Sequence, residues 1–259
     1  MWDLHMHSTF SDGRNTAEEM VLSAAEMGME CVGLSEHAHT AGDDCGMTPE
    51  NTLAYRAETE RLKEAYAGRI RVLCGVERDY YSDDDLDYDY VIGSVHWIRM
   101  EDGQMLPVDW TAEKLRAFTE KYYRGDWYAM TEAYYSLVSR VAEVTKCDII
   151  GHFDLVTKFI EQDPAFDLQH PRYVKAWQGA ADRLLKTGKV FEINTGAMSR
   201  GYRTEPYPSR EIREYLRKRG GKMILSSDSH RRETIGWRFE DFADEGVRDL
   251  SFLKYSEVL

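Results

Sequence analysis

The sequence has no long apolar stretch and few cysteines. No apolar run approaches the roughly 20 residues of a membrane-spanning helix, and the start at Met1, Trp2 and Asp3 leaves no room for a signal peptide. We therefore expect a cytoplasmic protein without a membrane segment. The four cysteines lie far apart and form no CxxC pair. This pattern predicts reduced, mostly buried thiols rather than disulfides or thiolate metal sites.

Positive charge is also scarce, with 33 Lys and Arg against 46 Asp and Glu and a net charge of −13. A protein that wraps nucleic acid needs a basic groove to displace counterions, so we expect no nucleic-acid partner. An anionic substrate is not excluded, because bound metal ions can reverse the sign of charge inside a site. The length of 259 residues suits one large α/β domain, and we expect a single domain over residues 1–259.

Short segments with strand character alternate with helical segments along the chain. The expected strands are residues 3–7, 30–35, 69–76, 88–95, 148–152, 190–194 and 223–227, and the expected helices are residues 16–27, 49–67, 111–123, 127–146, 171–187 and 209–219. Thr16 and Glu19 form a capping box at the start of the first helix. This alternation predicts an α/β fold with a parallel sheet and crossover helices. The pattern alone does not choose between an open sheet and a closed barrel.

Most of the histidines share one kind of position, at the carboxyl end of an expected strand. They are His5, His7, His37, His96, His152 and His230, and the carboxylates Glu77 and Asp228 have similar positions. In a parallel α/β fold these strand ends lie on one face, where active sites are built. Imidazoles combined with a few carboxylates are the ligands expected for zinc, manganese or iron.

A structural alternative has to be weighed against this metal site. Any single buried histidine is more often a core residue with satisfied hydrogen bonds than a metal ligand. Six such residues at equivalent strand ends are harder to explain in this way, because they would repel one another when protonated and compete for few acceptors. Their joint placement favours a metal centre.

Six motifs resemble those of the PHP (polymerase and histidinol phosphatase) family of metal-dependent phosphoesterases. They are Asp3-Leu4-His5-Met6-His7-Ser8 with Asp12 shortly after it, Ser35-Glu36-His37, Gly75-Val76-Glu77, Gly93-Ser94-Val95-His96, Gly151-His152-Phe153-Asp154 and Ser227-Asp228-Ser229-His230. A single HxH recurs by chance, whereas six motifs in order along nearly the whole chain are specific. Residues 191–196 and 199–203 are similar to the histidinol-phosphatase branch of the family.

The resemblance implies a distorted seven-stranded (β/α) barrel and a cluster of two or three divalent ions, either zinc, manganese or iron. It implies that His5, His7, Glu77 and Asp228 hold the first ion, that Glu77, His96 and His152 hold the second, and that Asp12, His37 and His230 hold the third. Asp12 stands where many relatives carry histidine.

Such a cluster suits a phosphate monoester, because cations offset the charge that repels a nucleophile and activate a bridging hydroxide. We expect hydrolysis of a small phosphorylated metabolite by in-line attack of this hydroxide. The resemblance favours L-histidinol phosphate as the substrate, within histidine biosynthesis. The residues expected to take part in the reaction are Glu77, Asp228, His230 and His39, and those expected to bind the phosphate are Arg200, Lys158 and His39.

Several alternatives stay open at this stage. Arg200 and Lys158 could be ordinary surface cations, and His39 could be a loop histidine that faces solvent. The protein could also be a phosphoesterase for another small metabolite or a nucleotide, or a metal-binding protein without catalytic activity. The sequence does not specify the oligomeric state, the native metal or the group that protonates the leaving alkoxide.

Overall fold

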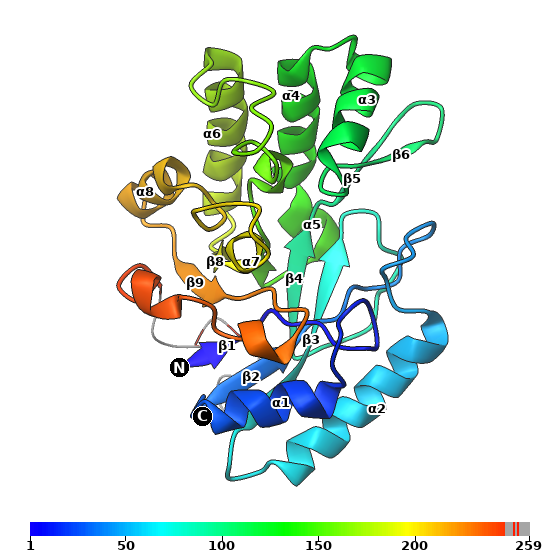
Figure 1. Ribbon diagram of the computed structural model, residues 1–259, viewed down its shortest axis with the longest axis vertical. Coiled ribbons are helices and arrows are strands. Elements are labelled where there is room, and N and C mark those ends of the chain that lie inside the picture. The colour runs from blue at the N-terminus through cyan, green and yellow to red at the C-terminus, as the bar shows by residue number, and fades with distance from the viewer. Residues whose placement is uncertain (247–250, 252, 254–259) are drawn as a thin grey trace.

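The structure is a computed structural model that describes residues 1–246, 251 and 253. Its centre is a sheet of seven strands in the order β1-β2-β3-β4-β7-β8-β9, and every neighbouring pair is parallel (Figure 1). The strands are β1 (Trp2–Asp3), β2 (Cys31–Leu34), β3 (Arg71–Asp79), β4 (Tyr90–Ser94), β7 (Ile149–Ile150), β8 (Val190–Asn194) and β9 (Met223–Ser226). The expected parallel sheet is confirmed.

The two edges of this sheet meet, so the sheet forms a nearly closed barrel. Met6, just after β1, makes a parallel bridge with Ser229, just after β9. The amide of His7 donates to the carbonyl of Ser229 over 2.9 Å, and the amide of Ser229 donates to the carbonyl of His5 over 3.2 Å. The expected barrel is therefore confirmed. Closure places the first and last motifs of the sequence side by side.

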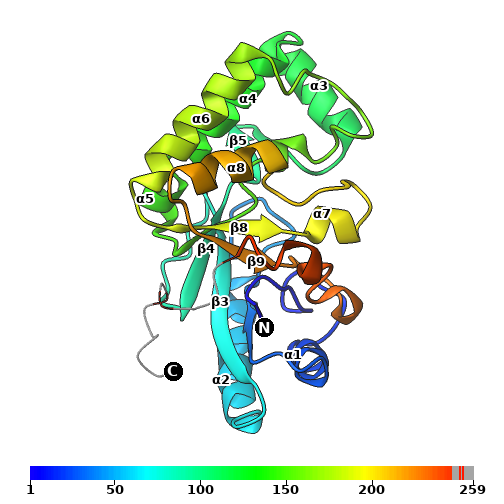
Figure 2. The ribbon, with the colours of Figure 1, turned by 90° about the vertical axis from the view of Figure 1, so that its left-hand side faces the viewer.

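The helices cover the barrel and extend beyond it at one end. They are α1 (Ala17–Glu26), α2 (Pro49–Ala65), α3 (Ala112–Tyr123), α4 (Trp127–Val138), α5 (Val141–Thr145), α6 (Pro171–Leu185), α7 (Gly196–Ser199) and α8 (Arg210–Lys218), with short 3₁₀ helices η1 (Leu155–Thr157), η2 (Arg232–Thr234) and η3 (Phe239–Phe242). Figure 2 shows α3, α4 and α6 packed together at one end and α1 and α2 at the other. In the described part of the chain, every helix is too short or too polar to cross a lipid bilayer.

The structure corrects some of the expected boundaries. The helix expected over residues 127–146 is broken at Ser139 and Arg140 into α4 and α5, and the break lets both segments turn buried side chains toward the core. A small antiparallel hairpin of β5 (Trp97–Arg99) and β6 (Met105–Pro107) was not expected, because each strand has only three residues. The capping box of Thr16 and Glu19 is confirmed.

The interior of the barrel changes from apolar to charged along its axis. Its apolar part is a cluster of Leu4, Cys31, Leu73, Tyr90, Ile92, Ile149, Val190, Ile224 and Leu253. Because side chains alternate along a strand, Leu73 and Glu77 of β3 lie on the same side, as do Val190 and Glu192 of β8. The apolar cluster therefore gives way to carboxylates at the carboxyl end of the barrel.

The ring of Tyr90 fills the middle of the barrel. Its hydroxyl donates to the carbonyls of Leu4 over 2.5 Å and Leu34 over 3.2 Å. A Cβ atom at Gly33 or Gly75 would overlap the Tyr90 side chain. Glycine is required at these two positions because the ring occupies the space that a side chain would need.

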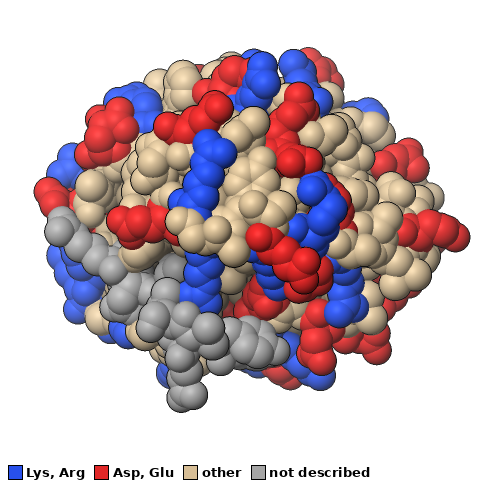
Figure 3. All heavy atoms as spheres, turned by 90° about the horizontal axis from the view of Figure 1, so that it is seen from below, with Lys and Arg blue, Asp and Glu red and all other residues tan. Residues whose placement is uncertain are grey.

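On the face at the α1 and α2 end, acidic and basic side chains are interspersed (Figure 3). The described residues form no continuous basic surface on this face. The absence of a nucleic-acid partner stays a prediction.

Substitution of Gly75 tests the packing of the barrel interior. We expect Gly75→Ala to lower the free energy of unfolding by about 1–3 kcal/mol, because the added methyl group overpacks the interior against Tyr90. Urea unfolding followed by circular dichroism measures this change. In the control Gly179→Ala, the new Cβ meets no atom within 4 Å in α6, so stability should rise by up to about 1 kcal/mol. Equal stability of Gly75→Ala and the parent protein would contradict the proposed packing.

Candidate metal centre

The carboxylate of Glu77 lies at the centre of the site, near the carboxyl end of β3. Ring nitrogens of five histidines lie within 3.5 Å of it: His5 at 3.1 Å, His7 at 3.5 Å, His37 at 3.0 Å, His96 at 3.4 Å and His152 at 2.9 Å. Burial would raise the pKa of this carboxyl, but His5, His37 and His96 hold the pKa of Glu77 well below its usual range. Glu77 is therefore an ionised carboxylate that is only 1% exposed.

Asp228 follows β9 and approaches the same cluster from the other edge of the closed barrel. Its Oδ1 lies 3.4 Å from Nε2 of His7 and 3.9 Å from Nε2 of His5. Burial would raise its pKa, but Arg200 and His5 hold the pKa of Asp228 well below the usual range. The backbone of Asp228 has a φ of 49°, in the left-handed region that non-glycine residues seldom adopt. Strain of this kind is concentrated at functional sites.

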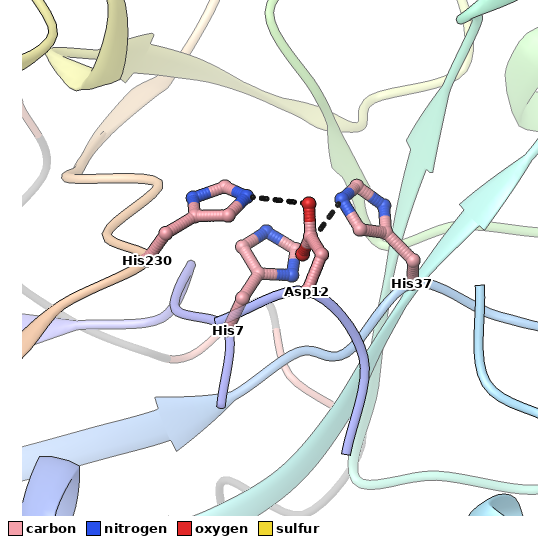
Figure 4. Close-up of side chains that lie close together, drawn as sticks. All are labelled: His7, Asp12, His37 and His230. Atoms are coloured by element: carbon pink, nitrogen blue, oxygen red, sulfur yellow. Dashed lines mark ion pairs between the residues drawn. The ribbon is translucent and has the colours of Figure 1, made fainter. Parts of the chain in front are cut away.

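Asp12 lies in the loop after β1 and faces two histidines from different parts of the chain (Figure 4). Its carboxylate oxygens lie 3.2 Å from Nε2 of His230 and 3.7 Å from Nε2 of His37. The ring of His7 lies between those of His37 and His230, with centroid distances of 4.2 and 4.3 Å. Burial opposes ionisation, but His37 and His230 lower the pKa of Asp12. This carboxylate is therefore available as a ligand.

The side chains form three groups whose ligand atoms lie within 4.8 Å of one another. The groups are His7, Asp12, His37 and His230; His5, His7 and Asp228; and His37, Glu77 and His96. They differ from the expected three sites in three places. His7 joins Asp12, His37 and His230, and Glu77 is absent from the group of His5, His7 and Asp228. His37 takes the place expected for His152, although Nε2 of His152 lies 2.9 Å from Glu77. The structure thus brings all the expected ligands together, and their division among individual ions stays a prediction.

The donor atoms of this cluster fit divalent cations. His5 Nε2, both ring nitrogens of His7, Glu77 Oε2 and His152 Nδ1 are buried without a hydrogen-bond partner among the described residues. Unpartnered buried polar atoms are costly, so such a concentration requires another kind of partner. Imidazole nitrogens and carboxylate oxygens are the donors that zinc and related metals bind.

The protonation states of the histidines agree with this fit. Burial and the neighbouring His37 and His230 lower the pKa of His7 to about 3, so it is neutral and ready to bind a cation. Burial alone would lower the pKa of His37 and His96, but nearby carboxylates raise these values to about 9 and about 10. Protons on these rings supply positive charge that the carboxylates require, and a metal ion can supply the same charge.

A second layer of carboxylates, which was not expected from the sequence, holds the histidines in place. Glu192 Oε1 lies 2.6 Å from Nδ1 of His5, and its Oε2 accepts the amide of His152 over 2.9 Å. Asp79 accepts the amide of His96 over 2.8 Å. Carboxylates in this position orient ligating imidazoles and tune their basicity. The signal for Glu192 was a carboxylate flanked by Phe191 and Ile193 in β8, at a position that faces the barrel interior.

The three side chains expected to meet a substrate have different surroundings. Arg200 joins the cluster, with its guanidinium 3.0 Å from Asp228 Oδ2 and 3.2 Å from His230 Nδ1. Lys158 lies 2.7 Å from the carbonyl of Asp109 and 3.2 Å from its carboxylate. Burial raises the pKa of Asp109, but Lys158, His96 and His152 together lower it. The amide of Val108, the residue before Asp109, donates to the carbonyl of His96 over 2.9 Å, so this ion pair lies near the cluster.

His39 is not part of the three groups of possible ligands. Its Nδ1 lies 2.6 Å from the carboxylate of Asp83, in the loop after β3. Arg200 therefore contacts the metal centre directly, and Lys158 is linked to it by way of Asp109. His39 pairs with the loop carboxylate of Asp83 instead. The roles of these three residues stay predictions.

The fold and the site define a class of protein: a parallel α/β barrel with a histidine and carboxylate metal centre at its carboxyl end. The model of the family described as the PHP domain matches residues 3–196. This chain belongs to the PHP domain family, which confirms the expected family resemblance.

Relatives and solved structures resemble the chain over nearly its full length. A protein of Deinococcus radiodurans described as "Probable histidinol-phosphatase" is 28% identical over 263 residues, which cover 96% of this chain and 93% of that protein. A structure from Listeria monocytogenes has a TM-score of 0.78 at 21% identity and covers 93% of this chain and all (100%) of its own. A histidinol phosphate phosphatase of Lactococcus lactis, solved with zinc, L-histidinol and phosphate, has a TM-score of 0.71 at 22% identity, covering 96% and 95%. These structural likenesses confirm the fold.

Substitution of Glu192 tests the second layer. We expect Glu192→Gln to weaken metal binding by about 10- to 100-fold, because the amide orients His5 less strongly than the carboxylate does. Competition with a chromophoric chelator measures the affinity for Zn²⁺ and Mn²⁺. In the control Glu60→Gln, the exposed residue pairs with Lys63 on α2, and metal affinity should stay unchanged. Equal affinities of the two variants would show that Glu192 does not support the centre.

Proposed function

We propose that this protein is a metal-dependent phosphomonoesterase that hydrolyses L-histidinol phosphate to L-histidinol and phosphate, in histidine biosynthesis. The observation that carries the proposal is the buried Glu77 carboxylate, with five imidazoles within 3.5 Å. The name of the Deinococcus relative and the ligands of the Lactococcus structure support this substrate. In this proposal, residues 1–259 act as one catalytic domain.

The expected ligands hold two or three divalent ions, either zinc, manganese or iron. They are His5, His7, Asp12, His37, Glu77, His96, His152, Asp228 and His230. When bound, such ions offset the charge of the phosphate and lower the pKa of water, which supplies a nucleophile at neutral pH. Glu77 has a bridging position in this arrangement, because its two oxygens face different histidines.

Arg200 is our first choice for binding the phosphate. A guanidinium has five N–H donors in a fixed plane, which suits two oxygens of one phosphate group. Three contacts of Arg200 are to Asp228 and His230, so N–H groups remain for an anion. Its side chain is 30% exposed, so a substrate can reach it. Lys158 adds a second positive charge beside His96 and His152, although Asp109 partly neutralises it.

His39 is our candidate for protonating the leaving alkoxide. Its Nδ1 faces Asp83 at 2.6 Å. A carboxylate on one ring nitrogen leaves the other nitrogen to carry a proton toward the substrate. The side chain is 37% exposed, which leaves it accessible.

A substrate panel tests the proposed activity. We expect the purified protein with Mn²⁺ or Zn²⁺ to release phosphate from L-histidinol phosphate far faster than from nucleotides or other small phosphate esters. Phosphate release and the metal content of the same sample are measured together. Comparable rates on all esters would exclude the specific substrate. No turnover by the metal-loaded protein on any ester would favour a binding protein without catalytic activity.

Glu77→Gln tests the centre itself. We expect loss of activity with an intact fold, because the amide keeps the volume of the side chain but removes the charge that faces five histidines. Phosphate release and circular dichroism measure the two properties. Glu143→Gln is a matched control, because Glu143 pairs with Arg183 on the surface and should be dispensable. A Glu77→Gln protein with nearly the parent rate would refute the bridging role.

A further inference from the structure

Glu36 is a buried carboxylate beside the metal centre and is not one of the expected ligands. It directly precedes His37 in the loop after β2, and it is 0% exposed. Its carbonyl accepts the amide of Glu77 over 3.0 Å, so its backbone is fixed to the strand that carries the central carboxylate. In the described part of the chain, Glu36 belongs to none of the three groups of possible ligands. A buried carboxylate is costly unless donors compensate it, so the donors to Glu36 indicate its role.

The hydrogen bonds to the Glu36 carboxylate come from the loop after β1. The amide of Ser8 lies 3.0 Å from each of the two carboxylate oxygens, and the hydroxyl of Ser8 donates to Oε1 over 2.6 Å. The hydroxyl of Ser11 donates to the other oxygen, Oε2. These donors are neutral, so Glu36 serves as an acceptor of hydrogen bonds in a loop rather than as the partner of a basic side chain. One carboxylate thus holds this loop at two residues.

The same loop is folded tightly against the residues that follow β1. The amides of Ser11 and Gly13 both donate to the carbonyl of Ser8, over 3.2 and 2.9 Å. A Cβ atom at Gly13 would lie 2.4 Å from the carbonyl oxygen of His7, so this close approach requires glycine. Asp12 lies between Ser11 and Gly13 and is therefore presented by a tight turn.

Asp12 depends on this turn for its distance from the histidines. Aspartate has a short side chain, so its carboxylate reaches a shared cation only where the backbone comes close. Its oxygens face His230 and His37 (Figure 4). After Asp12, the amide of Arg14 donates to the carbonyl of His230 over 2.8 Å. The loop is therefore fixed to His230 after Asp12 and to Glu36 before it.

We propose that Glu36 is a positioning residue for the third expected ion. It acts through Ser11, whose hydrogen bond keeps Asp12 within reach of that ion. The inference rests on the proposed set of ions, in which Asp12, His37 and His230 share one ion. Because Glu36 also directly precedes His37, one buried group sets the approach of two of these ligands. Residues that orient ligands in this way commonly change metal affinity by about 10- to 100-fold.

Ser11→Ala tests this role directly, because it removes one hydroxyl and leaves the buried carboxylate in place. Asp12→Ala first identifies which measured affinity belongs to the third ion. We expect Ser11→Ala to weaken the binding of that ion by about 10-fold and to leave the other ions unaffected. Titration of the metal-free protein with Mn²⁺, followed by calorimetry and metal analysis, measures these affinities. Added to Asp12→Ala, Ser11→Ala should cause no further loss, because the residue that it positions is already absent.

Ser139→Ala is the matched control for Ser11→Ala. Both serines are half-buried, and the hydroxyl of Ser139 donates to the carbonyl of Ser136 over 2.8 Å at the end of α4. We expect this control to keep the parent affinity for every ion. A loss of affinity for the third ion as large as that in Ser11→Ala would contradict the proposed path through Asp12.

Two substitutions of Glu36 separate its hydrogen bonds from its charge. Glu36→Gln keeps an oxygen that accepts from Ser8, and its new N–H group can donate to the hydroxyl oxygen of Ser11. We therefore expect affinity for the third ion close to that of the parent protein. Glu36→Leu removes every acceptor and should weaken this ion at least as much as Ser11→Ala does. Equal losses in the Gln and Leu variants would overturn the inference, because charge rather than hydrogen bonding would then support the site.

The decisive measurement is the affinity of Ser11→Ala for the third ion, because this variant leaves the buried interior unchanged. Parent-like affinity would overturn the inference, as would an equal further loss when the change is added to Asp12→Ala. A parent protein that binds only two ions would also overturn it, since it would have no third ion to position. These titrations use metal ions without substrate, so a failure of the proposed substrate leaves their outcome unaffected.

Discussion

The structure depends on one buried negative charge. Glu77 is 1% exposed, and a carboxylate in that environment is stable only when positive charge or strong donors surround it. Five imidazoles from different motifs and the hydroxyl of Ser94, 2.6 Å from Oε1, meet this requirement. Each of these side chains lies at or just beyond the carboxyl end of a strand or bridge in the parallel sheet. The barrel is thus the scaffold that brings distant residues to one carboxylate.

Closure of the barrel is as important for assembling the metal centre as the strands themselves. The bridge of Met6 with Ser229 sets His5 and His7 opposite Asp228, and without it the group of these three side chains would not form. Glu192 then fixes His5 from inside the barrel, on the strand next to β9. Below this layer, apolar side chains and the ring of Tyr90 fill the barrel, and the glycines at positions 33 and 75 leave the space that this ring needs. The charged layer and the apolar layer of the interior are therefore separated along the barrel axis.

Most of the fold and the ligand set could be predicted from the sequence, for a physical reason. A parallel sheet gathers its carboxyl strand ends, so strand periodicity and histidine positions suffice to place His37 or His96 at one site. Contacts between remote side chains were harder to predict. The partner of His39 is Asp83, and neither residue has a strand position that indicates the pairing. The break between α4 and α5 depends on packing against the core, which local propensity does not encode.

The cations near the centre can be distinguished by their partners and their exposure. Arg203, which the sequence places close to Arg200, has a side chain that is only 1% exposed and pairs with Asp154, so an anion from solvent cannot reach it. The charge of Lys158 is largely neutralised by the carboxylate of Asp109, 3.2 Å away. Arg200 has a partly exposed side chain and contacts Asp228 directly, so it lies between the metal centre and the solvent. A phosphate that enters the site therefore meets Arg200 as the most exposed of these three cations.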